Sequence, residues 1–234
     1  MDGRGPVADL AELAGRAVAV PVGAVARWRH GRAVHPRGAV FDAVLERYGA
    51  TPPVEVPWLD AEHSEPVVVR LSRGAGLPAP LPDVLGLAIR LGAEEAPVDL
   101  LLSSAGRGPW SRRVPIPRIG EAVSYGSIMA YSTTAGPVRI TARAETSGLS
   151  SDPAPVAAAA DAGALVFTLA AAVAGEGWRP FARLRSTGSR GPLDPAVRFD
   201  AVRNPPPGLV PDGPLARFRA PAYAAARVAG PEGR

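Results

Sequence analysis

The chain has 234 residues, of which 47% are hydrophobic, and its 26 arginines and 22 acidic residues give a formal net charge of +4. Cysteine and lysine are absent, which excludes disulfides, thiolate nucleophiles, Cys-ligated zinc, iron–sulfur clusters and Schiff-base lysines. No apolar run is long enough for a membrane helix and the N-terminus has no secretory pattern, so we expect one cytoplasmic domain without a membrane span. The arginines are scattered and aromatic residues are few, so nucleic-acid binding is not favoured.

The first part of the chain, residues 1–31, is predicted to be a helical arm. Leu10, Leu13 and Val18 have the spacing of a helix, and Pro21 interrupts it. We expect a barrel over residues 32–186 and an extended Pro-rich wrap with a short C-terminal helix over residues 187–234. All three parts are assigned to one domain.

Short apolar or alternating segments follow the arm, separated by Gly/Pro turns. Six of them predict β-strands: residues 67–72, 85–91, 98–103, 138–144, 165–169 and 179–184. Residues 40–45 fit a helix or a strand. Residues 147–161 look like a flexible connection, residues 204–214 like an extended stretch that is not a strand, and residues 215–228 like a helix. The pattern predicts a mainly β protein, an antiparallel barrel of about eight strands or a sandwich.

The segment from Arg32 to Gly38, which reads Arg-Ala-Val-His-Pro-Arg-Gly, contains His35, one of only three histidines. A neutral imidazole can pass a proton between two oxygens near neutral pH, and an arginine beside it can hold an anionic group. Taken alone, the segment is more simply a surface histidine in a basic loop.

Four short motifs occur in a specific order: Arg-x-Val-His-x-x-Gly over residues 32–38, Val-Arg-Leu-Ser over residues 69–72, Asp-Val-Leu-Gly-Leu-Ala-Ile-Arg over residues 83–90, and Asp-Leu-Leu-Leu-Ser-Ser over residues 99–104. This order resembles the amino-terminal half of the haem catalase barrel. That family has Arg-Val-Val-His-Ala-Lys-Gly, Val-Arg-Phe-Ser, Asp-Pro-Arg-Gly-Phe-Ala-Val-Lys-Phe and Asp-Leu-Val-Gly-Asn-Asn. The resemblance covers about residues 28–105 and implies a catalase-like barrel that binds haem b.

The resemblance implies a role for each matching residue. His35 matches the distal histidine, which takes a proton from peroxide and returns it to the far oxygen. Ser72 matches the serine that hydrogen-bonds this histidine. Arg32 and Arg70 match arginines that pair with haem propionates, and Val34 matches a valine that packs over the haem.

Ser103 departs from the family pattern, because it stands where catalases have an asparagine that orients peroxide. The chain is also much shorter than an ordinary catalase. Within the resemblance, these departures favour a catalase-related peroxidase or peroxygenase that uses peroxide and an organic small-molecule substrate, with weak catalase activity at most.

The iron ligand is expected near the C-terminus. Catalases use a tyrosine four residues after an arginine, and Arg219-Ala-Pro-Ala-Tyr223 repeats that spacing after a Pro-rich segment. The resemblance therefore implies Tyr223 as the metal ligand and Arg219 as its partner. The same spacing also arises by chance in an Arg-rich chain.

Other interpretations stay open. A haem-free catalase-fold protein could bind an apolar small molecule or be non-catalytic. An unrelated β-barrel hydrolase has little support, because no Gly-x-Ser-x-Gly motif occurs. His63 lies among carboxylates, for which a solvated acidic loop is a simpler interpretation than a metal site. The turn aspartate Asp83 is expected to be structural, and a homo-oligomer is left open.

Overall fold

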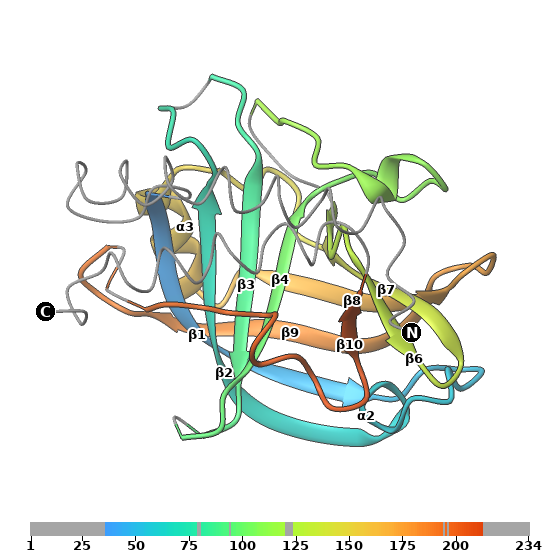
Figure 1. The fold of residues 1–234 in the computed structure, drawn as a ribbon. Helices are drawn as coiled ribbons and strands as arrows, with labels where there is room; N and C mark the ends of the chain where they lie inside the picture. Colours follow the sequence, from blue (N-terminus) through green and yellow to red (C-terminus); the bar gives the residue numbers. More distant parts are fainter. Residues whose placement is uncertain are drawn as a thin grey trace, which may run out of the picture.

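The computed structural model describes residues 36–78, 81–93, 95–119, 124–193, 195 and 197–212, and it is a closed antiparallel β-barrel (Figure 1). Eight strands form the ring: β1 (Arg37–Tyr48), β2 (Glu62–Arg73), β3 (Leu85–Leu91), β4 (Val98–Ser104), β5 (Ser124–Gly126), β7 (Gly136–Ala144), β8 (Val166–Val173) and β9 (Arg179–Ser189). Their order is β7-β5-β4-β3-β2-β1-β9-β8, and pairing of β8 with β7 closes the ring. The predicted fold class is confirmed, whereas the predicted N-terminal arm and C-terminal helix lie outside the described residues.

Two further strands extend the sheet beyond the ring. β6 (Ala130–Thr133) forms a hairpin with β7, and β10 (Val210–Asp212) pairs with β6. The described residues also form two short helices, α2 (Pro57–Asp60) and α3 (Pro153–Asp161), and a 3₁₀ turn, η1 (Ser111–Arg113). None of the helices in the described ranges is long and apolar enough to cross a bilayer.

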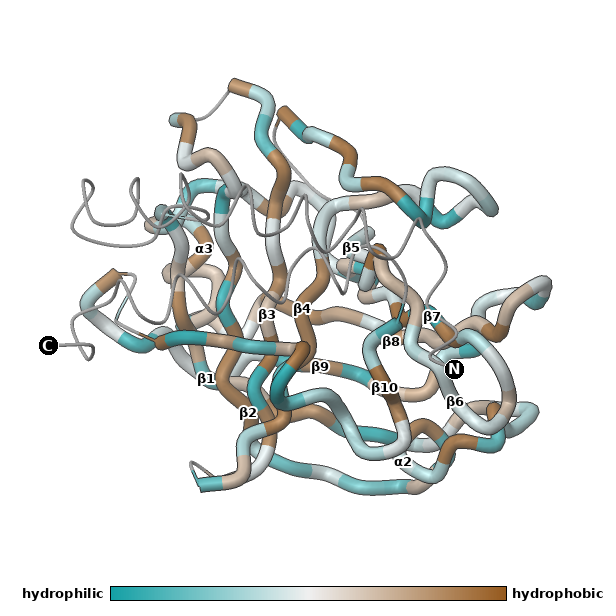
Figure 2. The backbone as a smooth tube through the Cα atoms, in the orientation of Figure 1, coloured by the Kyte–Doolittle hydropathy of each residue, from teal (hydrophilic) through white to brown (hydrophobic). Residues whose placement is uncertain are grey.

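The barrel interior is apolar because side chains alternate between the two faces of each strand. In β3, the residues Leu85, Leu87, Ile89 and Leu91 are buried in the core, and Gly86, Ala88 and Arg90 alternate with them on the outer face. Leu87 lies between Leu71 of β2 and Leu102 of β4, so the inward residues meet in cross-strand layers. Figure 2 shows apolar residues along the barrel strands and polar residues mainly in the connections.

The two helices lie at opposite ends of the barrel (Figure 1). In α2, Trp58 packs at 5.8 Å between ring centroids on Phe181 of β9. Both oxygens of Asp60 accept backbone N–H groups, from Val54 at 2.8 Å and Val56 at 3.0 Å, which fixes the turn before the helix. At the other end, α3 lies against β1 and β9 and adds Val156 to the core.

Four expectations about local structure were wrong or incomplete. The ambiguous segment 40–45 is strand, because both of its neighbours, β2 and β9, pair with it. The segment 147–161 contains α3, which starts at Pro153, a residue suited to the first turn of a helix. The Pro-rich segment 204–214 contains β10, and β9 continues to Ser189, three residues beyond the predicted end of the barrel at 186.

Tyr125 in β5 supplies a test of the buried core. Its ring packs edge-on at 6.2 Å from Phe167, and complete burial raises the pKa of its phenol. The phenol of an unfolded tyrosine has a pKa of about 10, whereas folded Tyr125 keeps its proton above that pH. The stability contributed by burying the neutral phenol is therefore complete below that pH and is lost as the pH rises.

We expect the free energy of unfolding to fall above pH 10 with a Tyr125 contribution of about 1.4 kcal/mol per pH unit. Tyr125→Phe should remove this contribution, as measured by denaturant unfolding at a series of alkaline pH values. Tyr48, whose pKa is also raised by burial but whose side chain is 48% exposed, is the comparison. Tyr48→Phe should change the slope less, and equal slopes for wild type and Tyr125→Phe would contradict the assignment.

Candidate functional site

One residue from each of the four sequence motifs lies in a row on the outer face of the barrel. Gly38 of β1 is opposite Ser72 of β2, Ser72 is opposite Gly86 of β3, and Gly86 is opposite Ser103 of β4. Directly opposed residues in antiparallel strands have side chains on the same face. The row continues across β5, β7 and β8. We call this set the small-residue row: Gly38, Ser72, Gly86, Ser103, Gly126, Thr141 and Ala170.

Arg70 lies beside the row on the same face, two residues before Ser72, and it is only 4% exposed. A Cβ atom placed on Gly38 would lie 2.8 Å from Arg70 Cζ and 2.7 Å from the carbonyl oxygen of Leu71. The guanidinium therefore occupies the space that a side chain at position 38 would need. Close packing of Arg70 from the second motif therefore explains why the first motif has a glycine at position 38.

The outer face is shielded from solvent at this place. Val40, two residues from Gly38 on the same face, is 1% exposed, and Gly38 and Gly86 are buried. The wall formed by the row carries small side chains or none, with hydroxyl groups in it and Arg70 beside it. Hydroxyl and guanidinium groups suit a ligand with an anionic edge.

Two predicted catalytic residues contribute hydroxyl groups to this wall. Ser72 Oγ lies 3.5 Å from the carbonyl oxygen of Gly86, longer than an ordinary hydrogen bond between these atoms. Ser103 is one strand further, beyond β3, so its Cα is about 10 Å from that of Ser72. Within the described part of the chain, no hydrogen bond involves the Ser103 hydroxyl.

The other predicted site residues cannot be located. His35, Arg32, Val34, Arg219 and Tyr223 all lie outside the described residues. Among the described tyrosines, Tyr125 and Tyr131 are buried in the barrel core. His63 pairs with Arg47 across β1 and β2, and its side chain is 56% exposed and 3.9 Å from Glu65. The described ranges contain no group of three or more His, Cys, Asp or Glu side chains that could hold a metal ion.

The two carboxylates near the motifs have structural roles. Asp83 accepts the backbone N–H groups of Ala75 at 2.8 Å and Leu77 at 3.1 Å, which closes the β2–β3 connection as expected for a turn aspartate. Asp99 is completely buried, and its carboxylate accepts hydrogen bonds from Arg90 Nε and Nη2, each at 2.8 Å. It also binds the backbone N–H of Asp200 at 2.8 Å.

These contacts hold residues 198–204 on the outer face of β3 and β4. Phe199 lies under the Arg90 guanidinium at 5.1 Å, and Asn204 donates to Asp99 at 3.0 Å. Arg90 and Asp99 are four residues along their strands from Gly86 and Ser103. The segment after β9 therefore wraps back across the barrel beside the small-residue row.

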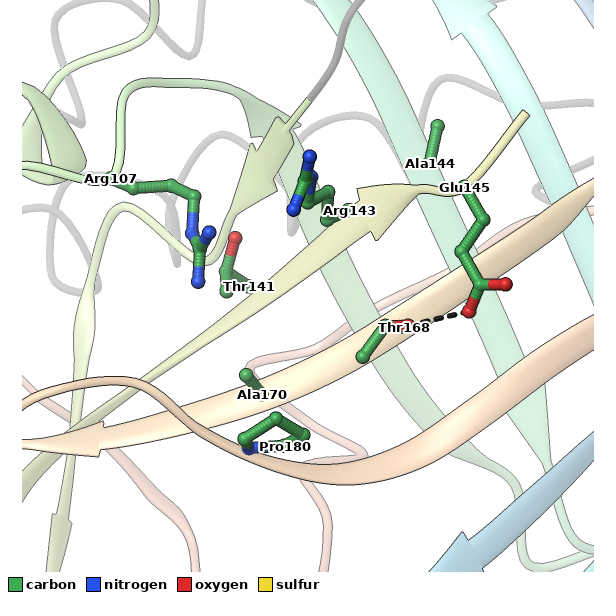
Figure 3. Close-up of a pocket in the computed structure, with 8 residues that line it drawn as sticks. All are labelled: Arg107, Thr141, Arg143, Ala144, Glu145, Thr168, Ala170 and Pro180. Carbon is green, nitrogen blue, oxygen red and sulfur yellow. Dashed lines mark hydrogen bonds between the residues drawn. The ribbon is translucent and has the colours of Figure 1, made fainter. Parts of the chain in front are cut away.

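The structure also contains a polar pocket that the sequence analysis missed. Its volume is about 390 Å³, and it lies on the outer face of β7, β8 and β9 (Figure 3). Eight residues line it: Arg107, Thr141, Arg143, Ala144, Glu145, Thr168, Ala170 and Pro180. The sequence feature that could have indicated this pocket is the segment 100–120, which contains four arginines and no acidic residue. It did not stand out because arginines are scattered along the whole chain.

The pocket shares its floor with the small-residue row, since Thr141 and Ala170 belong to both. The connection after β4 crosses the row at Gly126, whose Cβ position would be 3.4 Å from Ala105 Cβ. It therefore separates the pocket from the part of the row that contains Ser72 and Ser103. Comparison with known proteins adds no assignment, because no family model and no curated protein matches the chain.

Proposed function

We propose that the protein is a haem-dependent oxidoreductase that uses peroxide, of the catalase-related peroxidase or peroxygenase kind. The observation that supports it most is the small-residue row. Each of the four motifs that carry the catalase resemblance contributes one residue to it, Gly38, Ser72, Gly86 or Ser103, and these residues are consecutive cross-strand neighbours. Consecutive antiparallel strands are neighbours whatever their sequence, so the support comes from the shared register of these four residues.

In this proposal the small-residue row would face one side of a haem, and Arg70 would supply a guanidinium suited to a propionate. The resemblance supplies the iron ligand of this proposal, Tyr223, with Arg219 as its partner, and Arg32 and Val34 would complete the haem contacts.

Haem, when bound, supplies the redox chemistry that consumes peroxide. The chain's own task is to bind peroxide and move its proton. His35 precedes Gly38 by three residues, a length of chain that spans at most about 11 Å. In the proposed mechanism the His35 imidazole accepts a proton from one oxygen of peroxide and returns it to the other oxygen. Ser72 orients the ring, and Ser103 donates a hydrogen bond to peroxide.

The first test is the absorption spectrum of the full chain reconstituted with haemin. We expect one equivalent of haem and a Soret band of the ferric tyrosinate type, which Tyr223→Phe abolishes. His35→Ala should keep the band and lose its change on adding peroxide. His63→Ala is the matched control and should change neither. No haem uptake by the wild-type protein would refute the proposal.

A second test asks whether haem lies on the small-residue row. Ser103→Leu adds a branched side chain to the wall, so haem uptake should fall at least about tenfold, because overpacking a fitted surface is unfavourable. Thr187→Leu, at an exposed position of β9, is the control. Unchanged haem binding in Ser103→Leu, with an unchanged circular dichroism spectrum, would place any haem elsewhere.

The alternative is a haem-free barrel that binds an apolar molecule. The wall favours it less, because Arg70 and two serine hydroxyls face any ligand there. It would be supported if haemin does not bind but a fluorescent fatty acid does, and Ser103→Leu blocks that binding.

A further inference from the structure

The arginines around the pocket on β7 and β8 are not neutralised. Arg107 and Arg143 line the pocket and are exposed. Arg112, Arg113 and Arg139 lie next to it, and the charges of Arg112 and Arg113 help to lower the pKa of Arg139, after burial as the main cause. In the described part of the chain, none of these five arginines is within ion-pair distance of a carboxylate.

The single carboxylate of the pocket already has partners. Glu145 accepts a hydrogen bond from Thr168 at 2.6 Å and pairs with Arg183 at 2.7 Å. These bonds lower the pKa of Glu145, with the Thr168 hydroxyl as the largest cause. In Figure 3, Glu145 lies at one end of the pocket, and Arg107 and Arg143 lie near Thr141. The pocket therefore has a cationic part and a neutralised end.

Contacts with Trp178 hold the cationic part in place. The Trp178 indole N–H donates to the Arg107 carbonyl oxygen at 3.0 Å, and its ring lies 6.0 Å from the Arg107 guanidinium and 5.7 Å from that of Arg112. Arg112 Nε is buried and has no hydrogen-bond partner. Like charges held together by a fixed ring repel one another, and a bound anion would remove that repulsion.

The floor of the pocket contains Thr141 and Ala170, and Ala144 and Pro180 add apolar lining. A volume of about 390 Å³ exceeds what a bare inorganic ion fills and lies in the range of small-molecule sites. The site thus combines guanidinium groups for a multiply charged head with apolar contact for the remainder of a ligand. Guanidinium groups suit phosphate in particular, because each can donate two parallel N–H bonds to two phosphate oxygens.

We propose that this pocket binds a phosphate-bearing small molecule, with Arg107 and Arg143 on the phosphate. The site shares Thr141 and Ala170 with the small-residue row, but the connection that carries Arg107 lies between it and the part of the row that contains Ser72 and Ser103. Its occupancy does not depend on haem. The proposal therefore stands or fails independently of the proposed function.

The test is calorimetric titration of the full chain with pyrophosphate at low and at physiological salt. We expect binding that weakens with salt. Arg107→Gln and Arg143→Gln should each weaken it about tenfold or more, since each removes a charge-assisted contact. Arg203→Gln removes the same charge from an exposed arginine outside the pocket and is the matched control. Glu145→Gln should tighten binding, because it removes the only carboxylate among the described residues that line the pocket.

Several outcomes would overturn the proposal. They are no binding of pyrophosphate at low salt, equal weakening by Arg203→Gln and Arg143→Gln, or equal affinity for acetate and pyrophosphate. A single-stranded oligonucleotide that binds and is not displaced by pyrophosphate would show a nucleic-acid surface instead. Thermal melting of each variant checks folding, which we expect to be retained because both arginines are exposed.

Discussion

Replacing Asp99 by alanine is expected to lower the free energy of unfolding by about 3–5 kcal/mol, which is the cost of removing one partner of a buried ion pair. The carboxylate is 0% exposed and accepts two bonds from Arg90, one from the Asp200 backbone and one from Asn204. Without it, the Arg90 guanidinium and the amide groups of residues 200 and 204 lose their acceptor. Chemical denaturation measures the loss.

The same substitution should free the segment that Asp99 holds. Trypsin cleaves after arginine, and Arg198 and Arg203 lie within residues 198–204. We therefore expect trypsin cleavage at these two residues to become faster in Asp99→Ala. Asp42→Ala is the control, since Asp42 lies on the same outer face but pairs with Arg190 at the surface, with side chains 45% and 48% exposed. It should cost at most about 1 kcal/mol. Equal losses in the two variants would contradict the role of burial.

Replacing Arg73 by methionine is the second substitution expected to have a large effect, again about 3–5 kcal/mol. Arg73 is 0% exposed, and its guanidinium donates to the carbonyl oxygens of Leu77 and Leu81 at 2.6 Å and to Ser151 Oγ. It also lies 3.9 Å from Asp83. The one side chain thus joins the β2–β3 connection to the residues before α3.

A double-mutant cycle identifies the part due to Asp83. Asp83→Asn keeps the shape of the side chain and removes its charge, so Arg73→Met should cost less in that background than in the wild type. Arg190→Met, at an exposed pair, is the control and should be nearly neutral. Strict additivity of Arg73→Met and Asp83→Asn would show that the two charges do not interact.

Sequence patterns predicted the strands that alternate strongly. β3 matches its predicted range of 85–91, because Leu, Ile and small or polar residues alternate in it without interruption. β5, β6 and β10 were missed because they have only three or four residues. β5 and β10 also form by pairing with β4 and β6, which are distant in sequence. α3 was missed because its alanines have no amphipathic pattern and only Val156 and Ala160 are buried.

The candidate site could be predicted in composition but not in arrangement. The motifs named Arg70, Ser72 and Ser103 individually, whereas their alignment with Gly38 and Gly86 depends on the strand register, which connection lengths and packing decide. The role of Gly38 became clear only from the position of the Arg70 guanidinium. The pocket at Arg143 needed the three-dimensional structure, since its two arginines lie 36 positions apart in the chain.

The wrapping segment and β10 also bear on aggregation. β4 pairs with β5 only at Ser103 and Ser104, so β5 does not cover the earlier part of β4. The wrapping segment covers it at Asp99, whose N–H donates to the Asn204 carbonyl oxygen at 2.7 Å. β10 is the outermost described strand, and its middle residue, Pro211, has no N–H to offer. Unpaired strand edges are templates for intermolecular β-pairing, and short strands with proline are poor ones. Release of residues 198–204 in Asp99→Ala should therefore promote self-association as well as unfolding, through the newly exposed edge of β4.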